Sequence, residues 1–337
     1  MTEAFGQRQR RQADYAAPVA GESVRYLTRE DVESVGLTGV EVIELLDAAF
    51  RAKREGGVEM PPKVGVHPRE DAFIHAMPAY LASADAVGVK WVAGYPDNQR
   101  LGLPYIHGLL VLSDAATGRP LAVMDATWIT EARTAAASML GIRALAERPV
   151  EGIGIIGCGR QGTVHLELAR EVFPTLARAT VFDRHPERAE ALAAAAPGLE
   201  VRVAASAPEV GDGAQVVVTT AAIVRDPDRP LGREHLGDAT VACAVDFDAS
   251  LSEDLFPDSA LFVVDDVAQY RYYRGQGYFA GYPDSPVELC DAIDPAATHE
   301  PGLRVLVPLG LALEDIAVAA EVNRRAAEAG LGRELPL

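Results

Sequence analysis

Apolar residues recur at near-helical spacing in three long stretches of the chain. The first covers residues 28–55 and starts at Thr28, a residue type that caps helices. The second, residues 130–148, is rich in alanine and ends before a proline. The third, residues 311–329, carries its apolar residues on one face. The spacing predicts a helix in each stretch.

A different pattern occupies residues 58–124. Short runs such as FIHAMPAY, VGVKWV and IHGLLVLSD are broken by glycine, proline and asparagine. Runs of this length between turn residues are typical of strands. This part of the chain therefore predicts an antiparallel or mixed sheet.

From residue 150 onward, short apolar runs alternate with amphipathic segments. The predicted strands are residues 152–156, 179–182, 200–203, 215–219, 240–244 and 260–264, and the predicted helices are residues 162–173 and 186–195. Strands and helices that alternate at this spacing favour a parallel, doubly wound α/β sheet.

A glycine-rich loop joins the first of these strands to the first helix. It reads Gly157-Cys-Gly159-Arg160-Gln161-Gly162. The first glycine allows a tight turn, the second lets a pyrophosphate approach the backbone, and the third lets helix and strand pack closely. The motif alone could be a simple glycine-rich turn, but the strand before it and the helix after it favour a dinucleotide site.

Residues at the ends of two later strands are further candidates for contact with the dinucleotide. Asp183 can accept hydrogen bonds from the adenosine ribose and would repel a 2′-phosphate, which favours NAD over NADP. Arg184 directly follows it and could meet a phosphate, so NADP stays an alternative. Thr219 and Thr220 end another strand, where they either contact the cofactor or cap the strand.

Basic residues in apolar surroundings are the candidates for substrate binding. Lys90 lies inside the apolar run VGVKWV, where an unpaired ammonium group is costly to bury. Arg133 lies in the alanine-rich predicted helix. A cluster of such cations would suit a carboxylate ligand. Surface lysines and a structural ion pair are the alternative interpretation.

Composition limits the function classes. The 337 residues argue for two domains, and 49 acidic against 31 basic residues give a net charge of -18. This balance argues against nucleic acid and anionic membranes as partners. No apolar run is long enough to span a membrane, no signal peptide is recognisable, and three scattered cysteines form no metal motif. We expect a cytoplasmic enzyme without a metal.

Several linked segments resemble the ornithine cyclodeaminase/mu-crystallin family. They are MPPK, MPAYL, VGVKWV, ITEARTAAAS, IGIIGCGRQG and LGLALEDIAVAA, and they extend over residues 60–320. The resemblance implies a Rossmann domain at residues 130–302, inserted in an α+β substrate-binding and dimerisation domain at residues 23–129 and 303–337. It also implies a homodimer. Independently of the resemblance, residues 1–22 mix charge, alanine and proline without periodicity, which predicts a mobile tail.

The resemblance also implies roles for single residues. Lys63, Lys90 and Arg133 match family positions that bind or activate the substrate's α-carboxylate and imine region, and Lys90 would assist catalysis. Asp246 matches an aspartate that exchanges protons near the reacting nitrogen; the alternative is a turn residue at a strand end. His75 stands where cyclodeaminases carry a glutamate for the distal amine, and neutral imidazole is a poorer counter-ion. It would contact the substrate or make a structural hydrogen bond.

Two departures from the family bear on the reaction. Phe-Asp-Ala-Ser follows Asp246 in place of the usual Pro-Gly-Lys, and the aromatic segment 270–282 is either a lid around the substrate or a packing patch. The expected function is an NAD(P)-dependent oxidoreductase for the C–N bond of a small amino or imino acid. A redox-neutral cyclodeaminase and a mu-crystallin-like binding protein are the alternatives.

Overall fold

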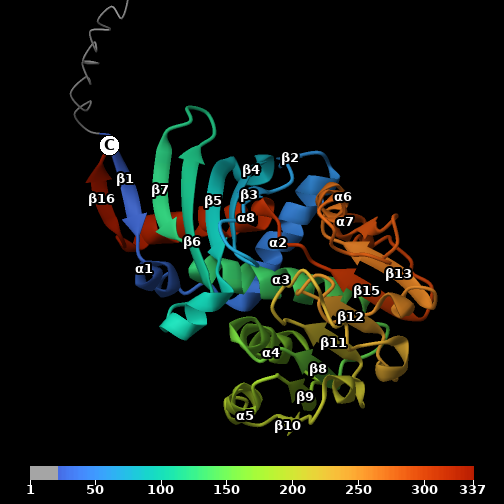
Figure 1. The fold of residues 1–337 in the computed structure, drawn as a ribbon. Coiled ribbons are helices and arrows are strands. Elements are labelled where there is room, and N and C mark those ends of the chain that lie inside the picture. Colours follow the sequence, from blue (N-terminus) through green and yellow to red (C-terminus); the bar gives the residue numbers. More distant parts are fainter. Residues whose placement is uncertain (1–21) are drawn as a thin grey trace, which may run out of the picture.

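Two sheets of eight strands each organise the protein (Figure 1). The computed structural model describes residues 22–337, so the tail predicted for residues 1–22 lies outside the described residues except for Glu22. No described helix is long and apolar enough to cross a membrane.

The first sheet contains both described ends of the chain. Its order is β16-β1-β7-β6-β5-β4-β2, with β3 paired to β4. The strands are β1 (Ser23–Leu27), β2 (Val58–Glu59), β3 (Val64–Val66), β4 (Phe73–Leu81), β5 (Ala86–Gly94), β6 (Ile106–Asp114), β7 (Pro120–Asp125) and β16 (Arg333–Pro336). Because β1 pairs parallel with β7 and the other pairs are antiparallel, the predicted mixed sheet is confirmed.

Helices cover one face of this sheet. They are α1 (Arg29–Ser34), α3 (Thr127–Leu145) and α8 (Ala312–Ala329), and α2 (Gly39–Arg54) packs on α3 and α8. Side chains alternate along β5, so Lys90 and Val92 are buried while Trp91 is exposed. The α8 helix packs on β4 and β5 and thus lies over the buried lysine.

The single helix predicted for residues 28–55 is wrong, because the chain forms two helices there. Gly36 adopts φ +65°, a left-handed conformation that ends the first helix. Thr38 then begins α2 with a capping box, in which it exchanges hydrogen bonds with Glu41. The apolar spacing continues across the break, which hides it from a periodicity argument.

The second sheet is parallel throughout, in the order β10-β9-β8-β11-β12-β15-β13-β14. Its strands are β8 (Gly152–Ile156), β9 (Arg178–Phe182), β10 (Glu200–Val203), β11 (Val216–Thr219), β12 (Val241–Ala244), β13 (Ser259–Val264), β14 (Val287–Glu288) and β15 (Leu303–Val307). Its helices are α4 (Arg160–Val172), α5 (Pro186–Ala194), α6 (Val267–Gly275) and α7 (Leu289–Ala292). The predicted doubly wound fold is confirmed, and the strand order reverses between β8 and β11, where such folds bind ligands.

The predicted boundary at residue 303 is wrong by one strand. β15 pairs with β12 and β13 inside the Rossmann sheet, so the chain leaves this sheet only after Val307. The apolar run of β15 is buried on both sides, as a central parallel strand requires. The loop after β15 then carries the chain into α8.

Candidate functional site

The glycine loop after β8 is shaped for close approach by a ligand. Gly157 has φ +88°, and a Cβ on it would lie 2.6 Å from the carbonyl oxygen of Thr220. A Cβ on Gly162 would lie 2.1 Å from the carbonyl oxygen of Gly157. At Gly159, by contrast, a Cβ would meet nothing within 4 Å. Packing thus requires glycine at positions 157 and 162. Gly159 instead leaves open space beside the loop that a pyrophosphate can fill.

The start of α4 supplies the donors for that pyrophosphate. Its first N–H groups have no partner within the helix, and they carry the positive end of its dipole. The Oε1 atom of Gln161 is buried there without a hydrogen-bond partner. Arg160 turns away and pairs with Glu131 at 2.8 Å. The loop therefore fits a dinucleotide, and the free Oε1 of Gln161 is available to it whereas Arg160 is paired with Glu131.

Asp183 is held beside the glycine loop at the end of β9. Its carboxylate accepts hydrogen bonds from the backbone N–H groups of Cys158 and His185, each at 2.8 Å. The remaining lone pairs of the carboxylate stay available for ribose hydroxyls. Arg184 pairs with Asp228 on the surface, so its charge is already engaged.

The two threonines after β11 hold other parts of the site. Thr219 donates to Asp246 at 2.5 Å, and Thr220 donates to the carbonyl oxygen of Gly157 at 2.7 Å. Of the two interpretations of the sequence, positioning by strand-end hydrogen bonds is the one their geometry supports. Thr220 acts on the cofactor loop, whereas Thr219 acts on the candidate proton-transfer residue.

Asp246 follows β12 and is only 1% exposed. Besides the bond from Thr219, its carboxylate accepts hydrogen bonds from Ser250 at 2.7 Å and from the N–H of Ala221 at 3.1 Å. Burial nevertheless raises the pKa of Asp246 to about 6. A carboxyl group with this pKa can gain or lose a proton near neutral pH.

The three predicted cations converge between the two sheets. Lys90 and Arg133 share the Asp315 carboxylate, at 2.6 and 3.1 Å, although they come from β5 and α3. Lys63 donates to the carbonyl oxygen of Leu309 at 2.6 Å. A Cβ on Gly310 would lie 2.5 Å from Arg133, so Lys63 and Arg133 meet at the loop between β15 and α8.

Three buried acids, which the sequence analysis did not assign, surround these cations. Glu314 pairs with Arg133 at 2.8 Å, and Asp315 pairs with Lys90 and Arg133. Asp265 accepts a hydrogen bond from the N–H of Gly310. Each acid also has one buried oxygen without a partner. Burial raises the pKa of Asp265 and of Glu314, whereas burial and Arg133 lower the pKa of Lys90 to about 8 and that of Lys63 to about 7. Lys90 and Arg133 therefore stay protonated near pH 7, and a bound anion would favour the protonated form of Lys63.

A signal for these acids was present. Glu314 and Asp315 interrupt the apolar run LGLALEDIAVAA, just as Lys90 interrupts VGVKWV. A buried charge requires a partner of opposite sign, so the two interruptions could have been matched.

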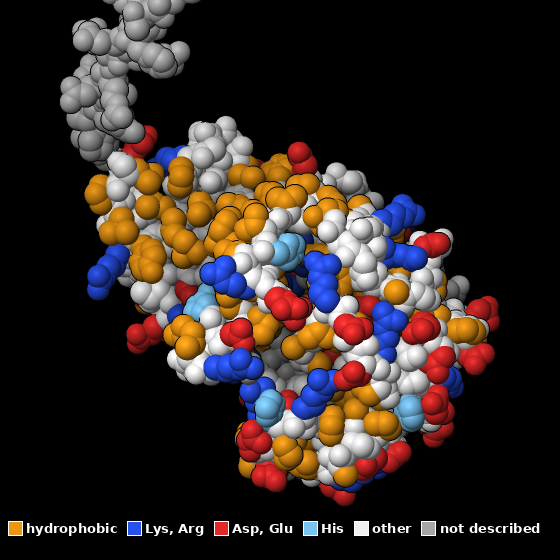
Figure 2. All heavy atoms as spheres, in the orientation of Figure 1, with side chains coloured by type: hydrophobic (Ala, Val, Ile, Leu, Met, Phe, Trp, Pro, Cys, Tyr) orange, Lys and Arg blue, Asp and Glu red, His pale blue; other side chains and the backbone are white. Residues whose placement is uncertain are grey.

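A narrow cleft opens beside the cluster. Lys63 and His75 line it with residues from the Rossmann domain, among them Arg225 and Tyr278. His75 stacks on Phe73 with ring centroids 4.4 Å apart, and burial lowers its pKa to about 3. The imidazole is thus neutral and lines the cleft, and the substrate contact of His75 stays a prediction. Figure 2 shows basic and histidine side chains around a hollow between the two parts of the molecule.

The aromatic segment 270–282 has two different faces. Tyr270 and Phe279 are fully buried and pack in an aromatic cluster, with their ring centroids 5.0 Å apart and the rings tilted by 45°. Tyr272, Tyr273 and Tyr278 line the cleft instead. One face of the segment is a packing patch, and the other forms a wall of the site.

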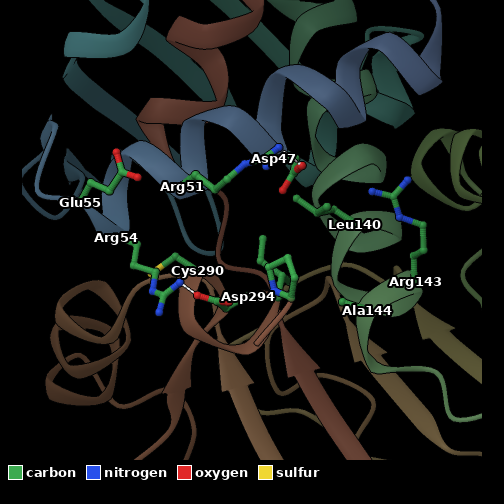
Figure 3. Close-up of a pocket in the computed structure, with 11 residues that line it drawn as sticks. Asp47, Arg51, Arg54, Glu55, Leu140, Arg143, Ala144, Cys290 and Asp294 are labelled. Atoms are coloured by element: carbon green, nitrogen blue, oxygen red, sulfur yellow. Dashed lines mark hydrogen bonds and ion pairs between the residues drawn. The ribbon is translucent and has the colours of Figure 1, made fainter. Parts of the chain in front are cut away.

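A second cavity of about 480 Å³ lies between α2, α3 and the segment that follows α7 (Figure 3). None of the predicted site residues lines it. Arg51 pairs with Asp47 there, and Arg54 pairs with Asp294 across the gap. The Arg54–Asp294 pair ties α2 to the Rossmann domain, whereas Arg51 and Asp47 both lie in α2. Among the residues that the structure describes, no group of three or more histidine, cysteine, aspartate or glutamate residues could hold a metal ion.

The glycine loop after β8 and the cation cluster lie at the same edge of the doubly wound sheet. Lys63 reaches over the ring of Phe247, the residue after Asp246, at 5.7 Å, and Asp265 follows β13. The carboxyl ends of β8, β12 and β13 thus share one site. This arrangement defines the class of nicotinamide-dependent oxidoreductases that bind small carboxylates. Within that class, the chain belongs to the ornithine cyclodeaminase/mu-crystallin family, whose sequence model matches residues 22–330.

Relatives of known name agree with this assignment. The chain is 34% identical over 316 residues to the nodulation efficiency protein NfeD of Rhizobium meliloti, covering 92% of this chain and 97% of the relative. Among solved structures, it resembles the Δ(1)-pyrroline-2-carboxylate reductase of Thermococcus litoralis in complex with NADH and L-proline, with a TM-score of 0.81, 27% identity and coverage of 93% and 100%. It also resembles an archaeal alanine dehydrogenase dimer with bound NAD, with a TM-score of 0.82, 28% identity and coverage of 93% and 99%. Both complexes agree with NAD as the predicted cofactor.

Proposed function

We propose that this protein is an NAD-dependent oxidoreductase that acts on the C–N bond of a small amino or imino acid. The observation that carries the proposal is the buried cluster of Lys63, Lys90 and Arg133. It lies at the carboxyl ends of the strands, where the glycine loop for the dinucleotide also lies. A carboxylate bound by the cluster would place the adjacent carbon–nitrogen bond within the same site. The relatives named above, an imine reductase and an amino-acid dehydrogenase, support it.

Each group has a defined task in this proposal. Lys63, Lys90 and Arg133 bind the α-carboxylate and orient the substrate. Bound nicotinamide supplies the hydride for reduction of an imine, or accepts it from an amino acid. Asp246 delivers or removes the proton at the substrate nitrogen, and it activates water if the imine is hydrolysed to an oxo acid. Thr219 and Ser250 hold the Asp246 carboxyl group in place.

The structure weighs against cyclodeamination of ornithine. None of the described residues that line the cleft is acidic, and the neutral imidazole of His75 faces it. A distal ammonium group in this cleft would thus find no lining carboxylate, because the buried acids Asp265, Glu314 and Asp315 lie in the cation cluster. A ligand-binding protein without catalysis would not need a carboxyl group of raised pKa at Asp246, which favours an enzyme.

A substrate panel tests the proposal. L-amino acids with NAD, and cyclic imino acids or 2-oxo acids plus amines with NADH, are followed by nicotinamide absorbance. Ornithine is scored by ammonia release, because a redox-neutral cycle leaves absorbance unchanged. Turnover of amino or imino acids supports the proposal. Ammonia release from ornithine with no net change in NADH would instead support the cyclodeaminase.

The cofactor preference depends on Asp183. We expect Asp183→Ala to reduce the ratio of kcat/KM with NAD to that with NADP by about 10-fold or more, because ribose hydrogen bonds and repulsion of the 2′-phosphate are both lost. Asp183→Asn is the control, since it keeps an acceptor for the N–H groups of Cys158 and His185. Equal use of NAD and NADP by the parent protein would contradict this role.

We also propose a homodimer formed by the uncovered face of the first sheet. On this face Trp91 is 52% and Leu109 is 41% exposed, and the two are direct cross-strand neighbours. Figure 2 shows apolar side chains gathered over β5, β6 and β7. An apolar face of this extent is typical of an interface, and the archaeal alanine dehydrogenase is a dimer.

The dimer is tested by placing charge on this face. Trp91→Glu combined with Leu109→Glu is expected to give a monomer in light scattering after gel filtration, because burial of two carboxylates opposes association. Val203→Glu is the matched control, as Val203 is 40% exposed at the far edge of the Rossmann sheet. A parent protein that is monomeric at micromolar concentration would contradict the proposal.

We place the protein in the cytoplasm, where its three free cysteines would stay reduced.

A further inference from the structure

The cleft beside the cation cluster is rich in hydrogen-bond donors and holds no carboxylate among the described residues that line it. Its walls include Lys63, His67, His75, Arg225, Tyr273 and Tyr278. This is unusual for a chain with 49 acidic and 31 basic residues. A lining of cations, imidazoles and phenols complements an anion and repels a cation.

Arg225 is the cation in this cleft that the proposed reaction leaves unused. It lies in the loop after β11 and donates to the carbonyl oxygen of Gln276 at 2.9 Å. Its guanidinium carbon lies 5.1 Å from the centre of the Tyr278 ring. These contacts place the group on the wall, yet no ion pair neutralises it within the described part of the chain. Arg229 differs, since it pairs with Asp248 and Glu253.

Acids near Arg225 form no ion pair with it within the described residues, although Asp226 is its neighbour in the chain. Asp71 and Asp248 are the carboxylates that act on Tyr278, the ring beneath Arg225. Asp248 is buried and already bound to Arg229, and Asp71 is exposed and lies outside the lining. The guanidinium therefore retains several N–H donors for a ligand.

We propose that the substrate carries a second carboxylate at the end of its side chain, and that Arg225 binds it. This inference rests on the proposed function: the α-carboxylate occupies the cluster at Lys63, Lys90 and Arg133, and the side chain extends along the cleft. The substrate is thus an acidic amino acid or the imine of a 2-oxo diacid. Arg225 is exposed and therefore solvated, so a hydrocarbon side chain would offer it no partner, whereas an ammonium side chain would be repelled.

The reaction balances without any further reagent. A 2-oxo diacid and ammonia condense to an imine with loss of water. The imine is then reduced as NADH is oxidised: hydride goes to carbon and a proton goes to nitrogen. The product is the amino diacid, and the reverse direction oxidises it with NAD.

The test compares substrates that differ in the second carboxylate. Oxaloacetate and 2-oxoglutarate, each with ammonia and NADH, are compared with pyruvate and 2-oxobutyrate. We expect the diacids to have the higher kcat/KM in the parent protein. Arg225→Met is expected to lower the ratio of diacid to monoacid kcat/KM by about 10–100-fold, the loss typical of a charge-assisted hydrogen bond. Arg225→Lys should restore part of the ratio, whereas Arg271→Met, at an exposed arginine of α6 outside the cleft, should leave it unchanged.

Two failures can be told apart. Turnover that favours monoacids, or an unchanged ratio in Arg225→Met, overturns the inference and leaves the proposed function standing. Absence of turnover with every substrate overturns the proposed function. In that case, calorimetric titration of the NADH-loaded protein with succinate and with propionate still decides the subsite. Succinate should bind more tightly, and this difference should vanish in Arg225→Met; equal binding in the parent protein would remove the subsite.

Discussion

Replacing Asp246 by asparagine is expected to lower kcat by about 10²–10⁴-fold, the usual contribution of a positioned acid or base. Asparagine keeps the size of the side chain and an oxygen that can accept from Thr219 or Ser250, but it cannot exchange the proton. NADH binding, followed by fluorescence, should be unchanged. Ser250→Ala is the matched control, because it removes one hydrogen bond to the carboxyl group and leaves the proton-exchanging group in place.

The pH dependence of turnover identifies Asp246 as the proton-exchanging group. Because burial raises the pKa of Asp246 to about 6, oxidation of an amino acid, which needs the carboxylate, should be lost as the pH falls below about 6. Imine reduction needs the protonated form and should decline as the pH rises above about 6. The Asp246→Asn variant should lack this limb of the profile. Unchanged turnover, or the same limb in the variant, would contradict the assignment.

Replacing Lys90 by methionine is expected to raise KM for any carboxylate substrate by about 10–100-fold, since a charge-assisted hydrogen bond is lost. Arg133 would still bind Asp315 at 3.1 Å, so the acid keeps a partner and the fold should survive. In the parent protein, KM should rise as the pH passes from about 7 to about 8, because burial and Arg133 lower the pKa of Lys63 to about 7 and that of Lys90 to about 8.

The control for this variant is another buried lysine. Lys53 forms ion pairs with Asp266 and Glu288 between α2 and the Rossmann domain, and its side chain is 12% exposed. Lys53→Met therefore reports the general effect of losing a buried ammonium group. A rise in KM of equal size in both variants, or none in Lys90→Met, would remove the anchoring role of Lys90.

The sequence predicted those site residues whose charge is unfavourable to bury in an apolar segment. Lys90 and Arg133 stand out because an unpaired charge in an apolar segment is unfavourable, and the structure brings both to one acid. The identity of that acid depended on the meeting of β5, α3 and α8, which are distant in sequence. Arg225 carried no local signal, because an arginine in a polar loop is ordinary until its neighbours are known.

The fold was predicted to a similar depth. Alternating strands and helices, with the glycine loop, established the doubly wound sheet. The break at Gly36 was missed because apolar spacing continues across it, and residues 303–307, which form β15, were assigned to the wrong domain because strand pairing is a long-range property. Local patterns predict elements, whereas their partners follow from packing.

The substrate assay with the full-length protein tests the central claim most directly. NADH absorbance is followed while the protein is given 2-oxo acids with ammonia, and then L-amino acids with NAD. We expect NADH to be consumed in the first case and formed in the second, with both reactions lost in Asp246→Asn. No change in NADH with any amino, imino or oxo acid, from a folded protein that binds NADH, would contradict the claim that it is an oxidoreductase of the C–N bond.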